Sequence, residues 1–140
     1  MNSIKKTAVI LLLQILFIQS GWSLEIEGTI SGVQSEGPVY IFIVTKEEMS
    51  TPAAGRYMQV LNPAPGADTI KYSFSNIPAG TYGIRIFQDL NSNGKLDKGL
   101  FGPSEPWDLS WTENKKIIPE FKDISFYLSE NRIIDFGLKK

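Results

Sequence analysis

The chain has 140 residues and a formal net charge of −1, and it contains neither cysteine nor histidine. It therefore lacks a disulfide framework, a thiol nucleophile, an imidazole general base and the main transition-metal ligands. Its mild acidic balance argues against a nucleic-acid partner, because such proteins show a basic face, and against charge-driven adsorption on anionic lipid.

Residues 1–23 predict a secretory signal peptide. Lys5 and Lys6 precede an apolar run over residues 8–18. Small residues then occupy the positions that a signal peptidase recognises, so we expect cleavage after Ser23. The run is shorter than the roughly 20 apolar residues of a membrane span, and an uncleaved anchor is the alternative. We expect a secreted or periplasmic protein with no membrane span in its mature form.

The mature chain, residues 24–140, predicts a single domain. It loses two of the 14 basic residues and none of the 15 acidic ones, which gives a net charge of −3. Residues 24–30 alternate apolar and polar side chains, the pattern of a half-buried strand. The continuous apolar run over residues 39–44 predicts a central strand covered on both faces. Residues 46–68 are rich in proline and glycine and predict a long loop, with one short element near residues 56–61.

The middle of the chain predicts a β-hairpin. Residues 70–74 alternate, residues 77–80 fit a type I turn with proline second and glycine fourth, and residues 81–87 alternate again. Tyr82 lies two residues beyond the turn glycine, where we expect its hydroxyl to bond to nearby backbone as a corner tyrosine.

The last strands complete the predicted fold. Residues 121–128 and 132–138 predict a final hairpin around residues 129–131. Short strands at this spacing predict an all-β fold, a two-sheet antiparallel sandwich. The predicted core residues are Ile26, Ile41, Ile43, Tyr72, Phe74, Ile84, Ile86, Phe126 and Phe136.

The segment from residue 89 to residue 97 has the spacing of a calcium-binding loop. Oxygen-bearing side chains fall at loop positions 1, 3, 5 and 9, and Gly94 at position 6 permits a sharp bend. Calcium takes six to eight hard oxygen ligands, which such a loop supplies. The candidate ligands are the side chains of Asp89, Asn91, Asn93 and Asp97 and the backbone carbonyl of Lys95.

The loop departs from this pattern at position 12, where Leu100 replaces the usual bidentate carboxylate. Glu105 or Asp108 can fold back to supply the missing charge. The alternative is an ion-free, Asx-rich turn with Asn93 and Gly94 at its tip.

Three functions are compatible with these residues. We favour a non-catalytic binding or accessory module for an unknown envelope or extracellular ligand, because no convincing catalytic set occurs. A small-ligand carrier would hold its pocket between the sheets or under residues 46–68. A carboxylate-based hydrolase would use Glu105, Asp108 or Asp89. The tryptophan-containing segment over residues 101–111 either covers the sandwich or forms a recognition surface.

The chain also resembles a family of exported bacterial proteins known as domain of unknown function 2141. The shared motifs cover residues 74–82, 86–97, 102–107 and 121–126. The resemblance implies a signal peptide and an immunoglobulin- or prealbumin-like sandwich, and no established activity. Members commonly carry histidine before the first aspartate, whereas this chain has Gln88.

Overall fold

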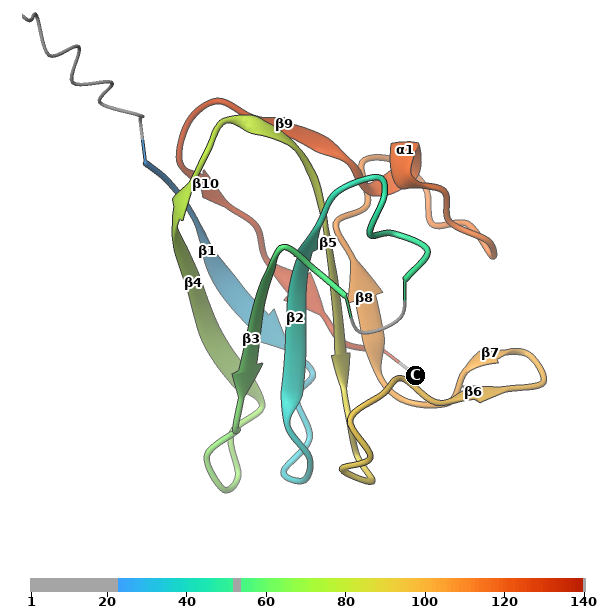
Figure 1. Cartoon of the computed structure of the whole chain (residues 1–140). Helices are drawn as coiled ribbons and strands as arrows, with labels where there is room; N and C mark the ends of the chain where they lie inside the picture. Colours follow the sequence, from blue (N-terminus) through green and yellow to red (C-terminus); the bar gives the residue numbers. More distant parts are fainter. Residues whose placement is uncertain (1–22, 52–53, 140) are drawn as a thin grey trace, which may run out of the picture.

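The structure, a computed structural model, describes residues 23–51 and 54–139, so the predicted signal peptide lies outside the described residues except for Ser23. Two sheets pack face to face, which confirms the predicted sandwich (Figure 1). The first sheet contains β1 (Leu24–Ser31), β4 (Thr69–Ile77), β10 (Arg132–Ile133) and β11 (Phe136–Gly137). The second contains β2 (Val39–Val44), β3 (Tyr57–Leu61), β5 (Gly80–Gln88), β8 (Trp107–Leu109) and β9 (Phe126–Leu128). The remaining elements are the pair β6 (Lys98–Gly99) and β7 (Gly102–Pro103) and the one-turn helix α1 (Phe121–Ile124).

In the first sheet, β1 lies between β4 on one side and β10 and β11 on the other. It pairs with β4 in antiparallel fashion, with Ile30 opposite Ile70. It pairs with the two C-terminal strands in parallel, with Ile30 opposite Phe136. These short parallel ladders depart from the wholly antiparallel pairing that we expected, because the chain enters β10 beside the start of β1, with Arg132 opposite Ile26, and then runs in the same direction as β1.

The second sheet has the order β3, β2, β5, and β5 then pairs with β9 near its start and with β8 near its end. The short element expected near residues 56–61 is strand β3. The buried residues between the sheets include all the predicted core residues except Phe126, which is half-buried and packs against them.

A second hydrophobic cluster covers the outer face of β2 and β5, which explains why the β2 sequence is apolar throughout. Phe42, Val44 and Phe87 form its buried part. The rings of Tyr40 and Phe87 stack above β2 and β5 with centroids 5.0 Å apart. The predicted burial of β2 on both faces is therefore confirmed.

Arg85 ties the segment after β2 onto this cluster. Its guanidinium lies 5.2 Å from the centroid of the Phe42 ring and donates hydrogen bonds to the backbone carbonyls of Met49, Thr51 and Ala54. Because the group is removed from water, its pKa lies below the usual arginine value. Arg85 thus attaches the described part of the loop before β3 to the sheet through three backbone carbonyls.

The predicted hairpin over residues 70–87 is wrong. β4 pairs with β1 in the first sheet, whereas β5 pairs with β2 in the second. Pro78 and Gly80 instead form a corner between the two layers. The Tyr82 hydroxyl donates to the Pro78 carbonyl at 3.0 Å, so the predicted corner tyrosine is confirmed.

The predicted final hairpin is also wrong. Residues 121–124 form α1, and the Asp123 carboxylate accepts the Glu120 backbone amide at 2.9 Å at its N-terminus. β9 then joins the second sheet and β10 joins the first, so residues 129–131 connect two layers rather than two paired strands. Burial of Ile124 against Gly83 of β5 favours this helical turn over a longer strand.

Candidate functional site

The Asp89 loop, residues 89–97, follows directly from the end of β5. Asp89 is completely buried, and its two carboxylate oxygens accept hydrogen bonds from the backbone amides of Asn93 (3.1 Å) and Gly94 (2.7 Å). Gly94 has φ +80°, a conformation that favours glycine, as the expected sharp bend requires. The loop therefore wraps around the Asp89 side chain.

Asp97 closes the loop from its other end. One of its oxygens accepts hydrogen bonds from the side-chain amides of Asn91 (2.6 Å) and Asn93 (2.9 Å). These two bonds, first that from Asn91, lower the pKa of Asp97 from its ordinary value. The oxygen of Asn93 accepts from the Lys95 backbone amide at 3.0 Å. The structure thus brings together all four predicted side-chain ligands, in an Asx-turn network.

Glu105 folds back onto this loop. Its carboxylate, only 5% exposed, accepts hydrogen bonds from the backbone amides of Leu90 (2.9 Å) and Asp97 (3.0 Å). The side chain therefore joins the two ends of the Asp89 loop. Leu100, at loop position 12, is 97% exposed and takes no part.

Asp108 belongs to a different network. It accepts hydrogen bonds from the Trp111 indole at 3.1 Å, the Lys115 ammonium at 2.8 Å and the Gly137 backbone amide at 3.1 Å. The Trp107 and Trp111 rings meet edge to face at 6.3 Å, and Trp107 packs against the second hydrophobic cluster. Both tryptophans are half-buried, so they cover the outer face of the second sheet.

Gln88 is a fully buried polar residue whose role the sequence did not reveal. Its amide nitrogen lies within hydrogen-bond distance of the carbonyls of Gln34, Glu36 and Gly37, and its oxygen accepts from the Gln34 backbone amide. Beside it, the Asp89 backbone amide donates to the Pro38 carbonyl at 2.9 Å. At this position Gln88 fixes the loop between β1 and β2 against the start of the Asp89 loop.

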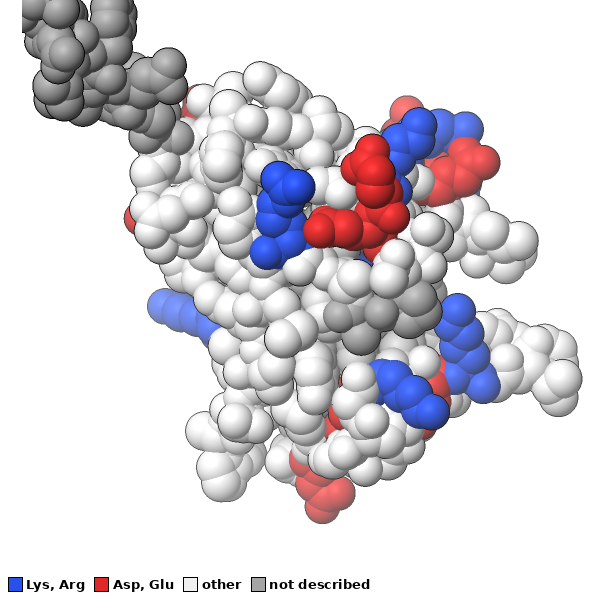
Figure 2. Space-filling model, viewed as in Figure 1, with Lys and Arg blue, Asp and Glu red and all other residues white. Residues whose placement is uncertain are grey.

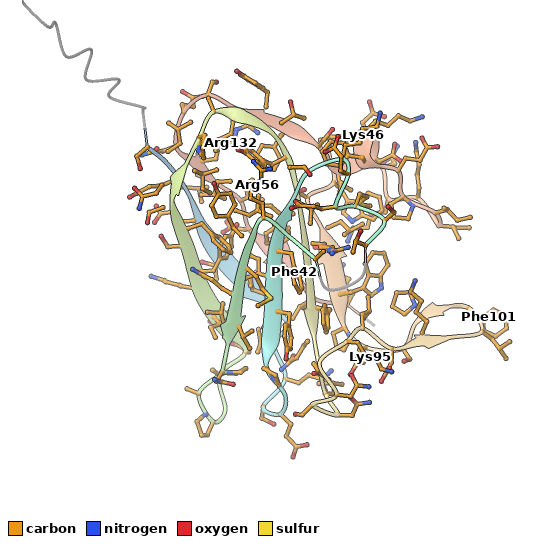
Figure 3. The ribbon with its side chains drawn as sticks, in the orientation of Figure 1. Phe42, Lys46, Arg56, Lys95, Phe101 and Arg132 are labelled. Carbon is orange, nitrogen blue, oxygen red and sulfur yellow. The ribbon has the colours of Figure 1, made fainter. Side chains whose placement is uncertain are left out.

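The finger, residues 98–103, extends from the Asp89 loop and was not predicted. β6 and β7 pair through Lys98 with Pro103 and Gly99 with Gly102, and the Ser104 amide donates to the Asp97 carbonyl at 2.9 Å. Phe101 lies at the outer end, away from the strands of the sandwich (Figure 3). The finger thus stands on the same backbone that Glu105 fixes.

An open cavity of about 600 Å³ lies elsewhere, across β1, β3 and β4. Glu27, Lys71 and Asp135 contribute charges to its lining, and Tyr72 contributes an aromatic ring. Burial raises the pKa of the Tyr72 hydroxyl, which donates to the Ile134 carbonyl at 2.6 Å. The cavity is open rather than enclosed between the sheets, and Gln59 and Leu61, which belong to residues 46–68, form part of its lining.

Two further findings concern the described part of the chain. Over residues 23–51 and 54–139, no helix has the length and apolar character needed to cross a bilayer. In the same part of the chain, no three His, Cys, Asp or Glu side chains form a group that can hold a metal ion. An ion in the Asp89 loop would therefore depend on amide and carbonyl oxygens as well as carboxylates.

The fold and these contacts define a small cysteine-free β-sandwich domain with an oxygen-rich loop at one end of its second sheet. The chain belongs to the family described as "Uncharacterized protein conserved in bacteria (DUF2141)", whose model matches residues 29–134. This confirms the resemblance seen in the sequence. Comparisons with curated proteins and with solved structures gave no match.

Proposed function

We propose that the chain is an exported, non-catalytic binding or accessory domain of the bacterial envelope or secretome, and that its Asp89 loop binds calcium. The observation that carries the calcium assignment is the convergence of Asp89, Asn91, Asn93 and Asp97 within one hydrogen-bonded loop. The export assignment rests on the sequence of residues 1–23.

The donor chemistry fits calcium. The loop offers two carboxylates and two amide oxygens, all hard ligands, and calcium accepts such mixtures in flexible geometry. The amide nitrogens of Asn91 and Asn93 donate hydrogen bonds to the Asp97 carboxylate and stabilise its charged form. If the two side-chain amides rotated, their oxygens would face the Asp97 carboxylate. A cation bound between them would then replace the amide N–H groups as the partner of that carboxylate.

The hydrogen bonds that the carboxylates accept support a non-catalytic role rather than that of a hydrolase. Asp89 and Glu105 each accept two backbone amides, and Asp108 accepts three donors. Catalysis by a pair of acids requires two carboxyl groups that flank the scissile bond. These three acids instead serve as acceptors inside the fold.

The open cavity supports a second candidate, a small-ligand carrier. Its charged lining, with Glu27, Lys71 and Asp135, suits a small polar ligand rather than an apolar one. The two roles are compatible, because the cavity and the Asp89 loop use different residues.

The calcium assignment is tested by thermal unfolding in chelator and in calcium. With a Kd at the weak end of about 10⁻⁴ to 10⁻³ M, calcium at about ten times Kd stabilises the fold by about 1.4 kcal/mol. In a domain of this size we expect the melting temperature to rise by roughly 3–8 °C.

Two matched variants separate the loop from the rest of the chain. Asp97→Asn removes a ligand charge and should abolish the calcium-dependent rise, whereas Asp68→Asn changes an exposed carboxylate elsewhere and should leave it unchanged. An unchanged melting temperature in the original chain would leave the ion-free Asx turn as the correct description. A rise that persists in Asp97→Asn would place the ion elsewhere.

A further inference from the structure

The finger presents two apolar side chains that have no packing partner in the described part of the fold. Leu100 is 97% exposed and Phe101 is 102% exposed, and both lie at the turn between β6 and β7. Exposed apolar residues are common singly, but adjacent, fully exposed Leu and Phe at the end of a projecting hairpin mark an interaction site.

A second projection repeats this arrangement. Ile117 and Ile118, in the segment before α1, are 99% and 81% exposed. The second projection, residues 112–119, is attached by contacts behind its tip: Thr112 donates to the Asp123 carbonyl, and Lys115 donates to Asp108. Its apolar pair thus stands on a fixed base, as the finger does.

Both projections extend from the same side of the sandwich (Figure 1). The outer ends of both are free of charged side chains, while charged groups lie closer to the body of the molecule (Figure 2). β1 begins on the opposite side (Figure 1). A surface that contacts both tips would therefore face away from the start of β1.

The shape of this side favours a lipid layer over a protein partner. Two separate convex tips would need two matched pockets on a protein, whereas a fluid bilayer interface accepts both without a complementary surface. Trp107 and Trp111 lie half-buried in the segment that connects the two projections, and such amphipathic rings are enriched where proteins meet the lipid headgroups.

Charge does not drive this interaction. Lys115 and Lys116 pair with Asp108 and Asp123, so their charges are largely neutralised within the domain. The mature chain is also acidic overall, as its sequence shows. Attraction by anionic lipid therefore cannot supply the binding energy, and burial of apolar side chains must do so.

We propose that the finger and the second projection insert Leu100, Phe101, Ile117 and Ile118 into the interfacial layer of a lipid bilayer. This inference names the partner of the proposed binding module and so rests on that role. Because the finger follows directly on the Asp89 loop, that loop would hold the finger in position while its tip inserts into the lipid.

The test uses site-specific labels, because the apolar run over residues 8–18 can itself bind lipid and confuse a measurement of total binding. The chain has no cysteine, so each of Phe101→Cys, Ile118→Cys and Ile133→Cys carries a single environment-sensitive dye. Ile133 is 73% exposed on β10 and serves as the control position. On phosphatidylcholine vesicles we expect blue-shifted, brighter emission at positions 101 and 118 and no change at 133.

A second measurement removes the finger's apolar pair. Leu100→Ser with Phe101→Ser should lower vesicle partitioning by about tenfold or more, whereas the control Met58→Ser with Ile133→Ser should leave it unchanged. Partitioning should change little between about 50 and about 500 mM salt, because charge does not drive it. Since all four side chains are exposed, unaltered melting temperatures will show that the variants are folded.

Several results would overturn the inference. The inference is wrong if the emission of labels at positions 101 and 118 does not change when vesicles are added. It is also wrong if the finger substitutions leave vesicle partitioning intact, or if high salt abolishes it. Self-association without vesicles, lost on substitution of the finger, would identify a second copy as the partner instead. If the calcium-dependent rise in melting temperature persists while the labels do not respond, the lipid inference alone fails.

Discussion

Glu105 provides the sharpest test of how the Asp89 loop is supported. Glu105→Ala leaves the backbone amides of Leu90 and Asp97 without the carboxylate that accepts their hydrogen bonds. Each of these two donors costs about 1–3 kcal/mol if left unsatisfied, or about 2–6 kcal/mol together, and water entering the space left by the side chain recovers part of this. We therefore expect the free energy of unfolding to fall by about 2–4 kcal/mol. Glu105→Gln keeps one acceptor and should cost about half as much.

Urea unfolding, followed by tryptophan fluorescence, measures both values directly. Trp107 and Trp111 lie in the chain segment that follows Glu105, so they report on the loop as well as on the fold. Glu36→Ala, at an exposed glutamate, is the matched control and should fall within about 0.5 kcal/mol of the original chain. If Glu105→Ala costs no more than this control, the inferred support of the Asp89 loop is wrong.

The remaining predictions concern export and pH. N-terminal sequencing of the protein recovered from a bacterial host should begin at Leu24, and an intact start at Met1 would contradict the signal-peptide prediction. Asp97 should titrate below 3.8 in a carboxyl-detected NMR experiment, because Asn91 and Asn93 stabilise its charged form. Its folded pKa is depressed, so its stabilising contribution is complete above the unfolded pKa and is lost as the pH falls through the folded value. A titration midpoint at or above 3.8 would contradict the two amide contacts.

The sequence predicted the β-sandwich and its core because buried positions appear as regularly spaced apolar residues along the strands. The unbroken apolar run of β2 predicted burial on both faces, and the second hydrophobic cluster confirms it. Tyr82 was placed correctly because the corner depends on a local contact with Pro78, only four residues away. Local geometry of this kind is encoded in a few adjacent residues.

Strand pairing was less predictable. The Pro78 to Gly80 turn has the same sequence pattern whether the chain reverses within one sheet or crosses to the other, and only the partners of β4 and β5 distinguish the two. Similarly, residues 126–128 and 132–133 alternate as paired strands would, yet they join different sheets. The α1 helix escaped notice because its four residues are fewer than any helical periodicity needs.

In the candidate site, the spacing of Asp89, Asn91, Asn93 and Asp97 predicted that these side chains share one loop. The sequence left two candidates for the carboxylate that folds back onto the loop, Glu105 and Asp108. The choice between them depended on tertiary contacts. Apart from its glycines, the finger segment has no sequence pattern that predicts a hairpin, because exposed apolar residues at a turn show no periodicity.

The placement of β1 has a consequence for the order in which the chain folds. β1 begins the described sandwich, yet it lies between β4 and the last two strands, and its Glu25 and Thr29 amides donate to Asn131 and Asp135, each 106 residues away. Such distant pairings are slow to form, because a long loop must close before they contribute. The first sheet cannot be completed until the C-terminal residues have been synthesised. β1 can pair with β4 earlier, but its other edge stays unpaired until β10 and β11 are available.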